Sequence, residues 1–147
     1  PSATTTAAAA AEAVPGPLRV QQTLTGHTRA VASLKLSPVD ESLLASASAD
    51  RSVRLWRIGG AGGDGAAAEA SAPGGMQHPA GVNDVAWSPL GNYLASASDD
   101  TVVRLWDAET GACLRALPGH TNYAYCCQFD PAGRLLVRTV LMYRVYD

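Results

Sequence analysis

The sequence predicts an all-β protein built from repeated units of short strands. Two nearly identical blocks, LASASAD at residues 44–50 and LASASDD at residues 94–100, are each followed by a tryptophan, Trp56 and Trp106. Each block is also preceded by a dipeptide that ends in histidine. Three such dipeptides occur in the chain: Gly26-His27, Gln77-His78 and Gly119-His120. Landmarks that recur in one order indicate a repeat protein with three repeat starts.

Between the landmarks, apolar and polar residues alternate as they do in β-strands that are buried on one face. In the first unit Ala32, Leu34 and Leu36 alternate, residues 37–40 form a turn, 43–48 a second strand, and Val53 and Leu55 mark a third. The second unit repeats this order and adds a Gly-containing turn at 108–111. Its expected strands are residues 82–87, 93–98, 102–106 and 112–117. Four strands per unit is the arrangement of a propeller blade.

The residues at these landmarks resemble those of the WD-repeat family. Trp106-Asp107 matches the dipeptide that names the family, and Trp56-Arg57 is a degenerate form of it. The resemblance covers residues 18–137 and implies a partial WD40 β-propeller with about two complete four-stranded blades and an incomplete third, not closed. The expected segments are a disordered N-terminal tail at 1–17, blade one with a preceding strand at 18–58, a Gly/Ala-rich loop at 59–76, blade two at 77–117 and an incomplete blade three at 118–147.

Two stretches depart from the repeat. Residues 59–75 are rich in Gly and Ala where the fourth strand of blade one is expected, so a loop is either inserted into that strand or replaces it. Blade three begins with strands at 123–129 and 135–137, but no Ser-x-Ser-x-Asp turn follows at 138–147. Tyr146-Asp147 either replaces the Trp-Asp pair or belongs to unrelated sequence. Residues 18–24 resemble the strand that closes a propeller, which leads us to expect a fragment of a longer repeat array.

The resemblance implies a buried polar network that serves structure and not catalysis. In the family, His, Ser, Asp and Trp of each blade form hydrogen bonds in series, which satisfies groups that would otherwise be buried unpaired. By position these residues are His27, Ser46, Asp50 and Trp56 in blade one, His78, Ser96, Asp100 and Trp106 in blade two, and His120 at the start of blade three. The set recurs once per repeat and no G-x-S-x-G elbow is present, so no catalytic residue is expected.

Composition excludes several other classes of function. Lys and Arg total 11 against 13 Asp and Glu, a net charge of −2, which provides no positive field for direct nucleic-acid binding. The odd cysteine count, with Cys113, Cys126 and Cys127, makes a disulfide framework improbable and favours a reducing compartment. No metal-ligand spacing, cofactor motif, phosphate-binding Gly-Lys-Ser/Thr, secretory signal or apolar run of about 18 residues occurs, so no metal, cofactor or membrane is expected.

Beyond the general landmarks, residues 26–31, 44–50, 82–87 and 119–127 are similar to the WD-repeat subunit of COMPASS-type histone H3 lysine-4 methyltransferase complexes. That resemblance implies a nuclear scaffold, also compatible with the cytoplasm, whose partners are the histone H3 tail and methyltransferase complex subunits. It further implies a central pocket that holds an arginine between two aromatic rings. Carried over by position, the wall of this pocket is Ala32, Ala49, Asn83, Asp99, Tyr123, Tyr125 and Cys126.

Within that implied pocket, Tyr125 is one ring, in place of the usual Phe, and Asn83 stands in place of the usual Ser. The second ring belongs to a later blade, so the expected site is half a pocket. Two alternatives stay open: a generic WD-repeat adaptor, such as a ubiquitin-ligase substrate receptor or an RNA-processing subunit, and a truncated product without independent activity. Unclosed blade edges also predict self-association, because an uncovered blade face exposes apolar surface.

Overall fold

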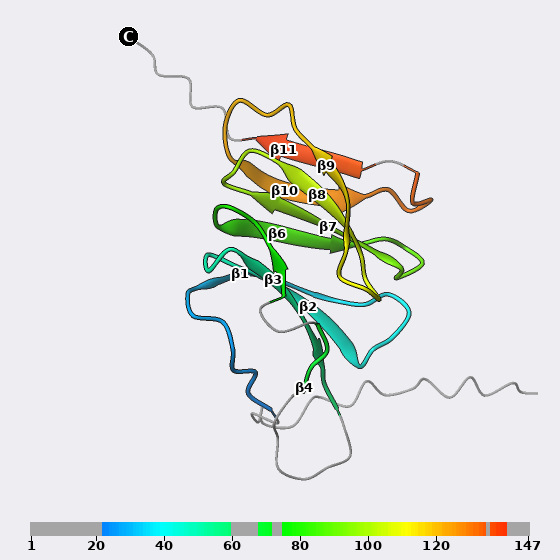
Figure 1. Ribbon diagram of the computed structural model, residues 1–147. Helices are drawn as coiled ribbons and strands as arrows, with labels where there is room; N and C mark the ends of the chain where they lie inside the picture. Colours follow the sequence, from blue (N-terminus) through cyan, green and yellow to red (C-terminus); the bar gives the residue numbers. More distant parts are fainter. Residues whose placement is uncertain (1–21, 60–67, 72–74, 135, 141–147) are drawn as a thin grey trace, which may run out of the picture.

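Three antiparallel β-sheets stack one on the next in the described part of the chain (Figure 1). The computed structural model describes residues 22–59, 68–71, 75–134 and 136–140. The predicted tail at 1–17, most of the predicted strand at 18–24, and residues 141–147 lie outside this range. The described residues contain no helix, and so no helix that could span a membrane. The all-β prediction is confirmed.

The first sheet follows chain order from β1 (Val31–Leu36) through β2 (Leu43–Ser48) to β3 (Ser52–Arg57). Two short strands, β4 (Ala68–Glu69) and β5 (Met76–Gln77), both pair with β3. β4 pairs with the end of β3 and β5 with its beginning. One piece of the fourth strand, β4, thus lies within the Gly/Ala-rich stretch, and the other, β5, follows it directly.

The second sheet has four strands in chain order: β6 (Val82–Trp87), β7 (Tyr93–Ser98), β8 (Val103–Asp107) and β9 (Cys113–Leu117). The third strand begins one residue later than predicted, at Val103. Val102 pairs with no neighbouring strand, whereas its counterpart in the first sheet, Ser52, pairs with Gln77 of β5. β9 likewise begins one residue later than predicted.

The third sheet pairs β10 (Ala124–Phe129) with β11 (Leu136–Val140). The second strand of this sheet, predicted at 135–137, is β11 and continues through residues 138–140. Cys127 of β10 lies opposite Arg138, just as Leu34 of β1 lies opposite Ser46. Arg138 thus takes the position that a serine holds in the first two sheets.

The first strand of every sheet carries a register shift at the same place. The unpaired residue is Ala32 in β1, Asn83 in β6 and Tyr125 in β10. A β-bulge inserts one residue and changes the direction of the side chain there. The alternation expected for Ala32, Leu34 and Leu36 is therefore interrupted at Ala32.

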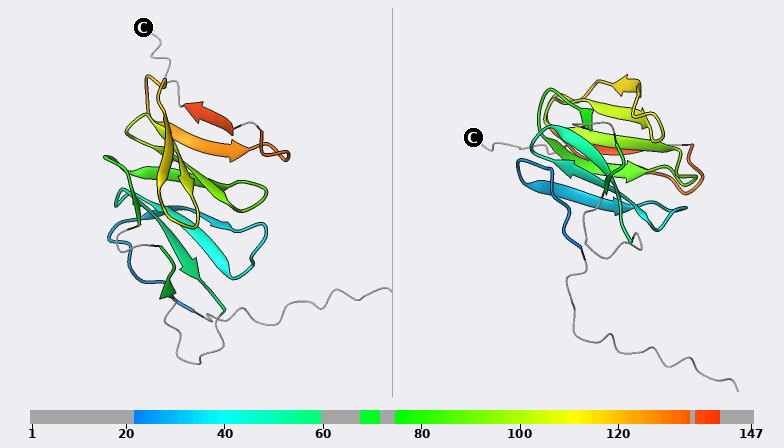
Figure 2. Two further views of the ribbon diagram at one scale, coloured as in Figure 1. Left: turned by 45° about the vertical axis from the view of Figure 1, so that its right-hand side comes forward. Right: turned by 60° about the horizontal axis from the view of Figure 1, so that its bottom comes forward.

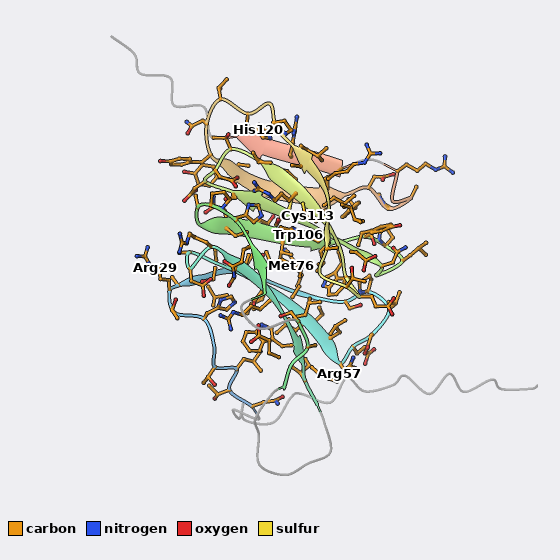
Figure 3. All side chains as sticks on the ribbon, in the orientation of Figure 1. Arg29, Arg57, Met76, Trp106, Cys113 and His120 are labelled. Carbon is orange, nitrogen blue, oxygen red and sulfur yellow. The ribbon has the colours of Figure 1, made fainter. Side chains whose placement is uncertain are left out.

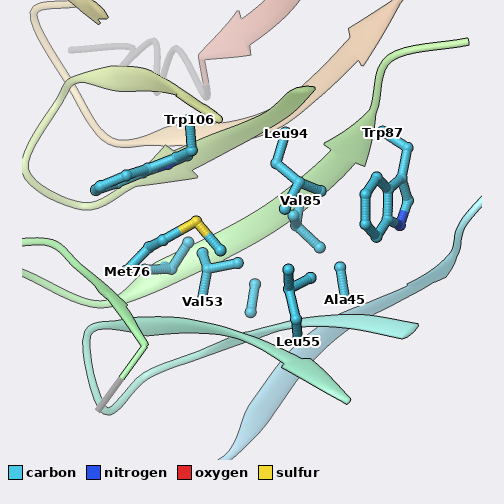
Figure 4. Packing of buried hydrophobic residues seen from close by; sticks show 10 residues of the cluster. Ala45, Val53, Leu55, Met76, Val85, Trp87, Leu94 and Trp106 are labelled. Carbon is cyan, nitrogen blue, oxygen red and sulfur yellow. The ribbon is translucent and has the colours of Figure 1, made fainter. Parts of the chain in front are cut away.

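The core lies between neighbouring sheets, because each sheet buries one face against the next (Figures 1 and 2). β1 contacts β6, and β6 contacts β10, so the first strands of successive sheets are neighbours. The cluster between the first two sheets combines small and branched residues with two tryptophans (Figure 4): Ala45, Ala47, Val53, Leu55, Met76, Val82, Val85, Trp87, Leu94 and Trp106. A second cluster joins the last two sheets: Ala86, Ala95, Ala97, Val103, Ala124 and Cys127.

Candidate binding site and the polar networks that support it

A chain of hydrogen bonds joins the second and third strands of the first sheet to the histidine before β1. The Ser46 hydroxyl lies 2.6 Å from His27 Nε2, and Trp56 Nε1 donates to the same oxygen at 2.7 Å. The other ring nitrogen of His27 lies 2.8 Å from Asp50 Oδ2. Because a carboxylate only accepts, Nδ1 carries the proton and Nε2 accepts from the serine. One serine oxygen thus satisfies two buried rings.

The second sheet repeats this chain with one change. His78 Nε2 lies 2.6 Å from Ser96 Oγ, to which Trp106 Nε1 donates at 2.8 Å. In the first sheet Ser52 Oγ donates to the Asp50 carboxylate at 2.6 Å, but valine holds this position in the second. The Arg104 guanidinium donates to Asp100 instead. Each aspartate therefore keeps a side-chain donor besides its histidine, from a different residue.

These contacts set the charge of the two aspartates. Burial alone would raise the pKa of Asp50, but hydrogen bonds from Ser52, His27 and the Thr28 amide hold that pKa well below its ordinary value of 3.8. In the second sheet burial again acts upward, and Arg104 with the Val102 amide lowers the pKa of Asp100. Both carboxylates therefore stay ionised inside their networks.

The third sheet lacks the serine of this network. Arg138 occupies its position, and the Arg138 guanidinium donates to the backbone oxygens of Leu117 and Pro118, at 2.8 and 3.4 Å. His120 Nε2 is buried and has no hydrogen-bond partner within the described residues. Burial lowers the pKa of His120, and the Arg138 charge lowers it further, because both disfavour the charged form of the ring. His120 lies in the third-sheet part of the stack (Figure 3).

Steric crowding explains why the residue before His27 is a glycine. Gly26 has a φ of 155°, and a Cβ there would lie 2.9 Å from the Trp56 ring and 2.8 Å from the Arg54 guanidinium. Only glycine lets the backbone come this close to the ring. In the second repeat Gln77 takes this position and is part of β5, which shows that the landmark tolerates a side chain there.

The candidate binding site lies where the first strands begin. Asn83 Nδ2, at the bulge of β6, donates to Asp99 Oδ1 at 2.7 Å and to the Ala124 carbonyl of β10 at 3.0 Å. The Tyr123 and Tyr125 rings, on either side of Ala124, meet edge to face at a centroid distance of 6.4 Å. Asn83 and Asp99 therefore form a hydrogen-bonded junction between the second and third sheets, joined to the segment that carries Tyr123 and Tyr125.

The other three predicted pocket residues occupy different positions. Ala49, which is exposed, lies against Gly81, where a Cβ would be 3.5 Å from the Ala49 Cα and 3.2 Å from Asp99 Oδ2. Ala32 is exposed at the β1 bulge. Cys126 is exposed and lines a groove farther along the first strands. The structure brings Ala49 to the edge of the junction and places Ala32 and Cys126 along the same row of strands.

That groove has a volume of about 570 Å³ and crosses all three sheets. Its apolar walls come from Trp87, Phe129, Pro38 and Pro89, and Asp84 contributes a carboxylate. The side chains that line it are Lys35, Leu36, Pro38, Asp84, Ala86, Trp87, Pro89, Cys126, Cys127, Gln128 and Phe129. Sequence reasoning did not single it out, because the residues come from three repeats and share no local pattern.

Sequence reasoning also missed two sets of contacts. The second serine of each SAS block, Ser48 or Ser98, donates to the backbone before the first strand and accepts from the aspartate amide. Its repetition in both blocks was a usable signal. Asp84 accepts from the Ser33 hydroxyl at 2.7 Å and from the Cys127 amide at 3.1 Å, and so joins three sheets. These contacts explain why the first strands stay aligned.

The chemistry of these residues is that of recognition. Each network serine is engaged by its histidine and its tryptophan, so its hydroxyl is held inside the blade. Among the described residues, no group of three or more His, Cys, Asp or Glu could hold a metal ion. By contrast, Asp99 Oδ2 has no hydrogen-bond donor among the described residues, and Asn83, which bonds Asp99 Oδ1, also bonds the Ala124 carbonyl between the two tyrosines. A carboxylate next to aromatic faces suits a planar cation.

Stacked antiparallel sheets, each held by the same histidine, serine and tryptophan in the two complete repeats, define a repeat-built β-scaffold of the propeller class. The family described as "WD domain, G-beta repeat" matches residues 18–57, 75–107 and 111–140, which is more than half of the chain. The chain belongs to this WD40 family. The expected open, partial propeller is confirmed.

Known relatives carry several different names. The chain is 38% identical to the probable coatomer subunit beta' of Schizosaccharomyces pombe over 69% of its length, but over only 12% of that protein. It is 37% identical to the nuclear distribution protein PAC1 of Arthroderma benhamiae over 82% of its length, and over 26% of that protein. It is 30% identical to pre-mRNA-processing factor 17 of Homo sapiens over 72% of its length, and over 17% of that protein. The chain thus spans about a quarter or less of these relatives, and none of the three is named for histone methylation.

Proposed function

We propose that this chain is a non-catalytic WD-repeat interaction module that takes an arginine side chain of a partner protein at the Asn83–Asp99 junction. The single observation that carries the proposal is the arrangement of Asp99. One of its oxygens is fixed by Asn83, and the other faces no donor among the described residues. An arginine guanidinium donates to a carboxylate in a plane and stacks on aromatic rings, which Tyr123 and Tyr125 offer here.

The resemblance to the WD-repeat subunit of COMPASS-type complexes makes the arginine-containing histone H3 tail the first ligand to test, with methyltransferase complex subunits as further partners in the nucleus. A lysine fits this junction less well, since its ammonium is a point charge without a planar face. Tyr123 is 48% exposed, which leaves ring surface available to a ligand.

The test is a titration of a fluorescent H3 N-terminal peptide with the 147-residue chain. We expect Asp99→Asn to weaken binding about tenfold or more, because hydrogen bonds to charged groups contribute roughly 1.5–3 kcal/mol. Tyr125→Ala, which removes one aromatic face, should weaken binding about twofold to fivefold, since an exposed cation–π contact contributes about 0.5–1 kcal/mol. Replacing the peptide's arginines by lysine should have a similar effect. Tyr93→Ala, an exposed tyrosine of the second sheet outside the junction, is the matched control and should leave the affinity unchanged. Binding that ignores Asp99→Asn would refute the proposal.

A second candidate is a general WD-repeat adaptor in the cytoplasm or nucleus that binds a partner through the 570 Å³ groove. Its apolar walls favour this candidate, as do relatives named for a coatomer, nuclear distribution and pre-mRNA processing. Two variants separate the candidates when tested against any bound partner. Phe129→Ala should weaken binding only to the groove, and Asp99→Asn only to the junction.

A further inference from the structure

The 570 Å³ groove presents hydrogen-bond donors that no neighbour uses. Lys35 is exposed, and its ammonium forms no ion pair with any described residue. Gln128 is exposed too, and its side-chain amide has no hydrogen-bond partner in the described part of the chain. Asp84, by contrast, has both oxygens engaged, one by the Ser33 hydroxyl at 2.7 Å and the other by the Cys127 amide at 3.1 Å. The groove therefore favours a ligand that accepts hydrogen bonds and carries negative charge.

One register position shared by the three first strands shapes the groove. Lys35, Ala86 and Gln128 hold this position in β1, β6 and β10, and all three line the groove. Because β6 is the strand that contacts both others, Ala86 lies between the cation and the amide. Its small side chain, which is 7% exposed, leaves room that the aromatic side chains of Trp87 and Phe129 help to enclose. The groove thus has an apolar floor between two polar donors.

The span of the groove suits an extended peptide. Packed β-sheets lie about 10 Å apart, so three sheets in a row span about 20 Å. An extended chain advances about 3.3 Å per residue, so roughly six residues cross the groove. The step from Lys35 to the Ala86 floor, from one sheet to the next, corresponds to about three of these residues.

We propose that the groove binds an extended acidic–apolar segment of a partner protein, with an Asp or Glu carboxylate at Lys35 and a leucine-sized side chain over Ala86. The inference rests on the second candidate function above, for which it names the chemistry of the partner. Charge complementarity supports it, because the Lys35 charge is unpaired while donors of the chain itself hold Asp84. A basic segment would instead place its cation against Lys35, which like-charge repulsion disfavours. The apolar side chain would remove the surface of the Phe129 wall from water.

Fluorescence anisotropy with two labelled six-residue peptides tests this pairing. Both peptides carry a leucine three residues after one variable position, which is glutamate in the first peptide and glutamine in the second. We expect the 147-residue chain to bind the glutamate peptide about fivefold more tightly, the upper end for an exposed ion pair. Lys35→Gln should abolish this preference, and Lys35→Arg should keep it because the charge is retained. Replacing the leucine of the peptide by alanine should weaken binding about tenfold, since less apolar area is buried.

Arg115→Gln is the matched control for the loss of charge. Arg115 is an exposed basic residue of β9 that does not line the groove, so its replacement changes the net charge by the same amount as Lys35→Gln. We expect this variant to keep the full preference for the glutamate peptide. Lys35 and Arg115 are both exposed, so circular dichroism should show that their variants retain the fold.

The chain also offers a direct spectroscopic readout, because Lys35 is its only lysine. Reductive methylation with isotope-labelled formaldehyde adds methyl groups to the Lys35 amine and keeps its positive charge. The glutamate peptide should shift the NMR signal of these methyl groups more than the glutamine peptide does. The methylated N-terminal amine, which titrates at lower pH, gives a separate signal that should not move.

The outcomes separate this inference from the groove function on which it rests. Equal affinities for the two peptides, a preference that survives Lys35→Gln, or a Lys35 signal that the glutamate peptide leaves unchanged would each overturn the inference. If the two peptides bind equally and Phe129→Ala weakens both, the groove remains a binding site and only its acidic preference is wrong. If neither peptide binds, the inference fails together with the groove as a peptide site.

Discussion

At the scale of single residues, a serine hydroxyl organises each complete blade. Ser46 and Ser96 are buried almost fully, and each joins a histidine ring and a tryptophan ring that meet edge to face at centroid distances of 5.7 and 5.6 Å. Both rings need a polar partner in the interior, and the serine oxygen serves as acceptor for one and donor for the other. The landmark serines thus act through hydrogen bonding as well as size.

Ser46→Ala should destabilise the chain by about 1–3 kcal/mol, the cost of leaving buried polar groups without partners. The loss of stability exceeds that for replacing an ordinary serine, because the variant leaves both His27 Nε2 and Trp56 Nε1 without their hydrogen-bond partner. Urea denaturation measures it. Ser42→Ala, in a half-buried turn where the hydroxyl bonds only surface groups, is the control, for which we expect less than about 0.5 kcal/mol. Equal losses for the two variants would contradict the role of the shared oxygen.

The Asp50 carboxylate makes stability depend on pH in the acid range. Its folded pKa lies below 3.8, so the folded state binds fewer protons than the unfolded state in this range. The stabilisation is therefore fully present above about pH 4 and is lost as the pH falls toward the folded pKa. Ser52→Ala removes one donor to the carboxylate and should move this acid limb to higher pH, and Asp50→Asn should flatten it. Free energies of unfolding at several pH values from about 5 to about 2 check both. An acid limb unchanged in Asp50→Asn would exclude this residue as its source.

At the scale of strands, alternation in the sequence predicted most elements to within a residue or two, because strands buried on one face must alternate. Residues 43–48, 82–87 and 93–98 are strands as expected. The bulges at Ala32, Asn83 and Tyr125 were not predictable, since a bulge depends on the pairing partner and not on local sequence. Nor was the divided fourth strand, whose Gly/Ala-rich composition carries no alternating signal.

The candidate site was predictable only through family resemblance. Composition and spacing say nothing about which residues meet across two sheets, and the contact of Asn83 with Asp99 and the Ala124 carbonyl depends on the bulge in β6. Ala32 and Cys126 share the row of first strands without joining that junction. The 570 Å³ groove escaped prediction for the same reason, because its walls come from three repeats.

The second strand of the third sheet offers a test at this scale. Arg138→Ser should restore a hydroxyl opposite Cys127, within reach of the orphaned His120 Nε2. Arg138→Ala loses the same guanidinium bonds without supplying the hydroxyl, so it is the matched control. We expect the serine variant to be more stable than the alanine variant by about 0.5–1.5 kcal/mol, the net worth of one hydrogen bond. Thermal or urea unfolding measures the difference, and equal stabilities would show that His120 does not use the serine position in this sheet.

At the scale of the whole molecule, stability is shared unequally along the stack. The cluster between the first and second sheets unites ten buried residues, including Trp87, whose Nε1 also donates to the Lys35 carbonyl of β1 at 2.9 Å. The cluster between the second and third sheets is smaller and consists mainly of alanines. In a repeat protein, stability depends on the interface of each repeat with its neighbours. The first two sheets should therefore unfold together, and the third should open first.

Hydrogen exchange read by mass spectrometry measures this order. Under native conditions we expect amides of β2 and β7 to exchange through the same global opening, and those of β10 to exchange through a smaller, earlier one. Val85→Ala, at the centre of the first interface, should cost roughly 2–4 kcal/mol and accelerate exchange in β2 and β7 alike, because its cavity lies between them. Cys127→Ala, a smaller truncation in the second interface, should accelerate β10 while leaving β2 nearly unchanged. If Val85→Ala affected only the second sheet, the two sheets would not form one cooperative unit, and the Asn83–Asp99 junction would rest on the second and third sheets alone.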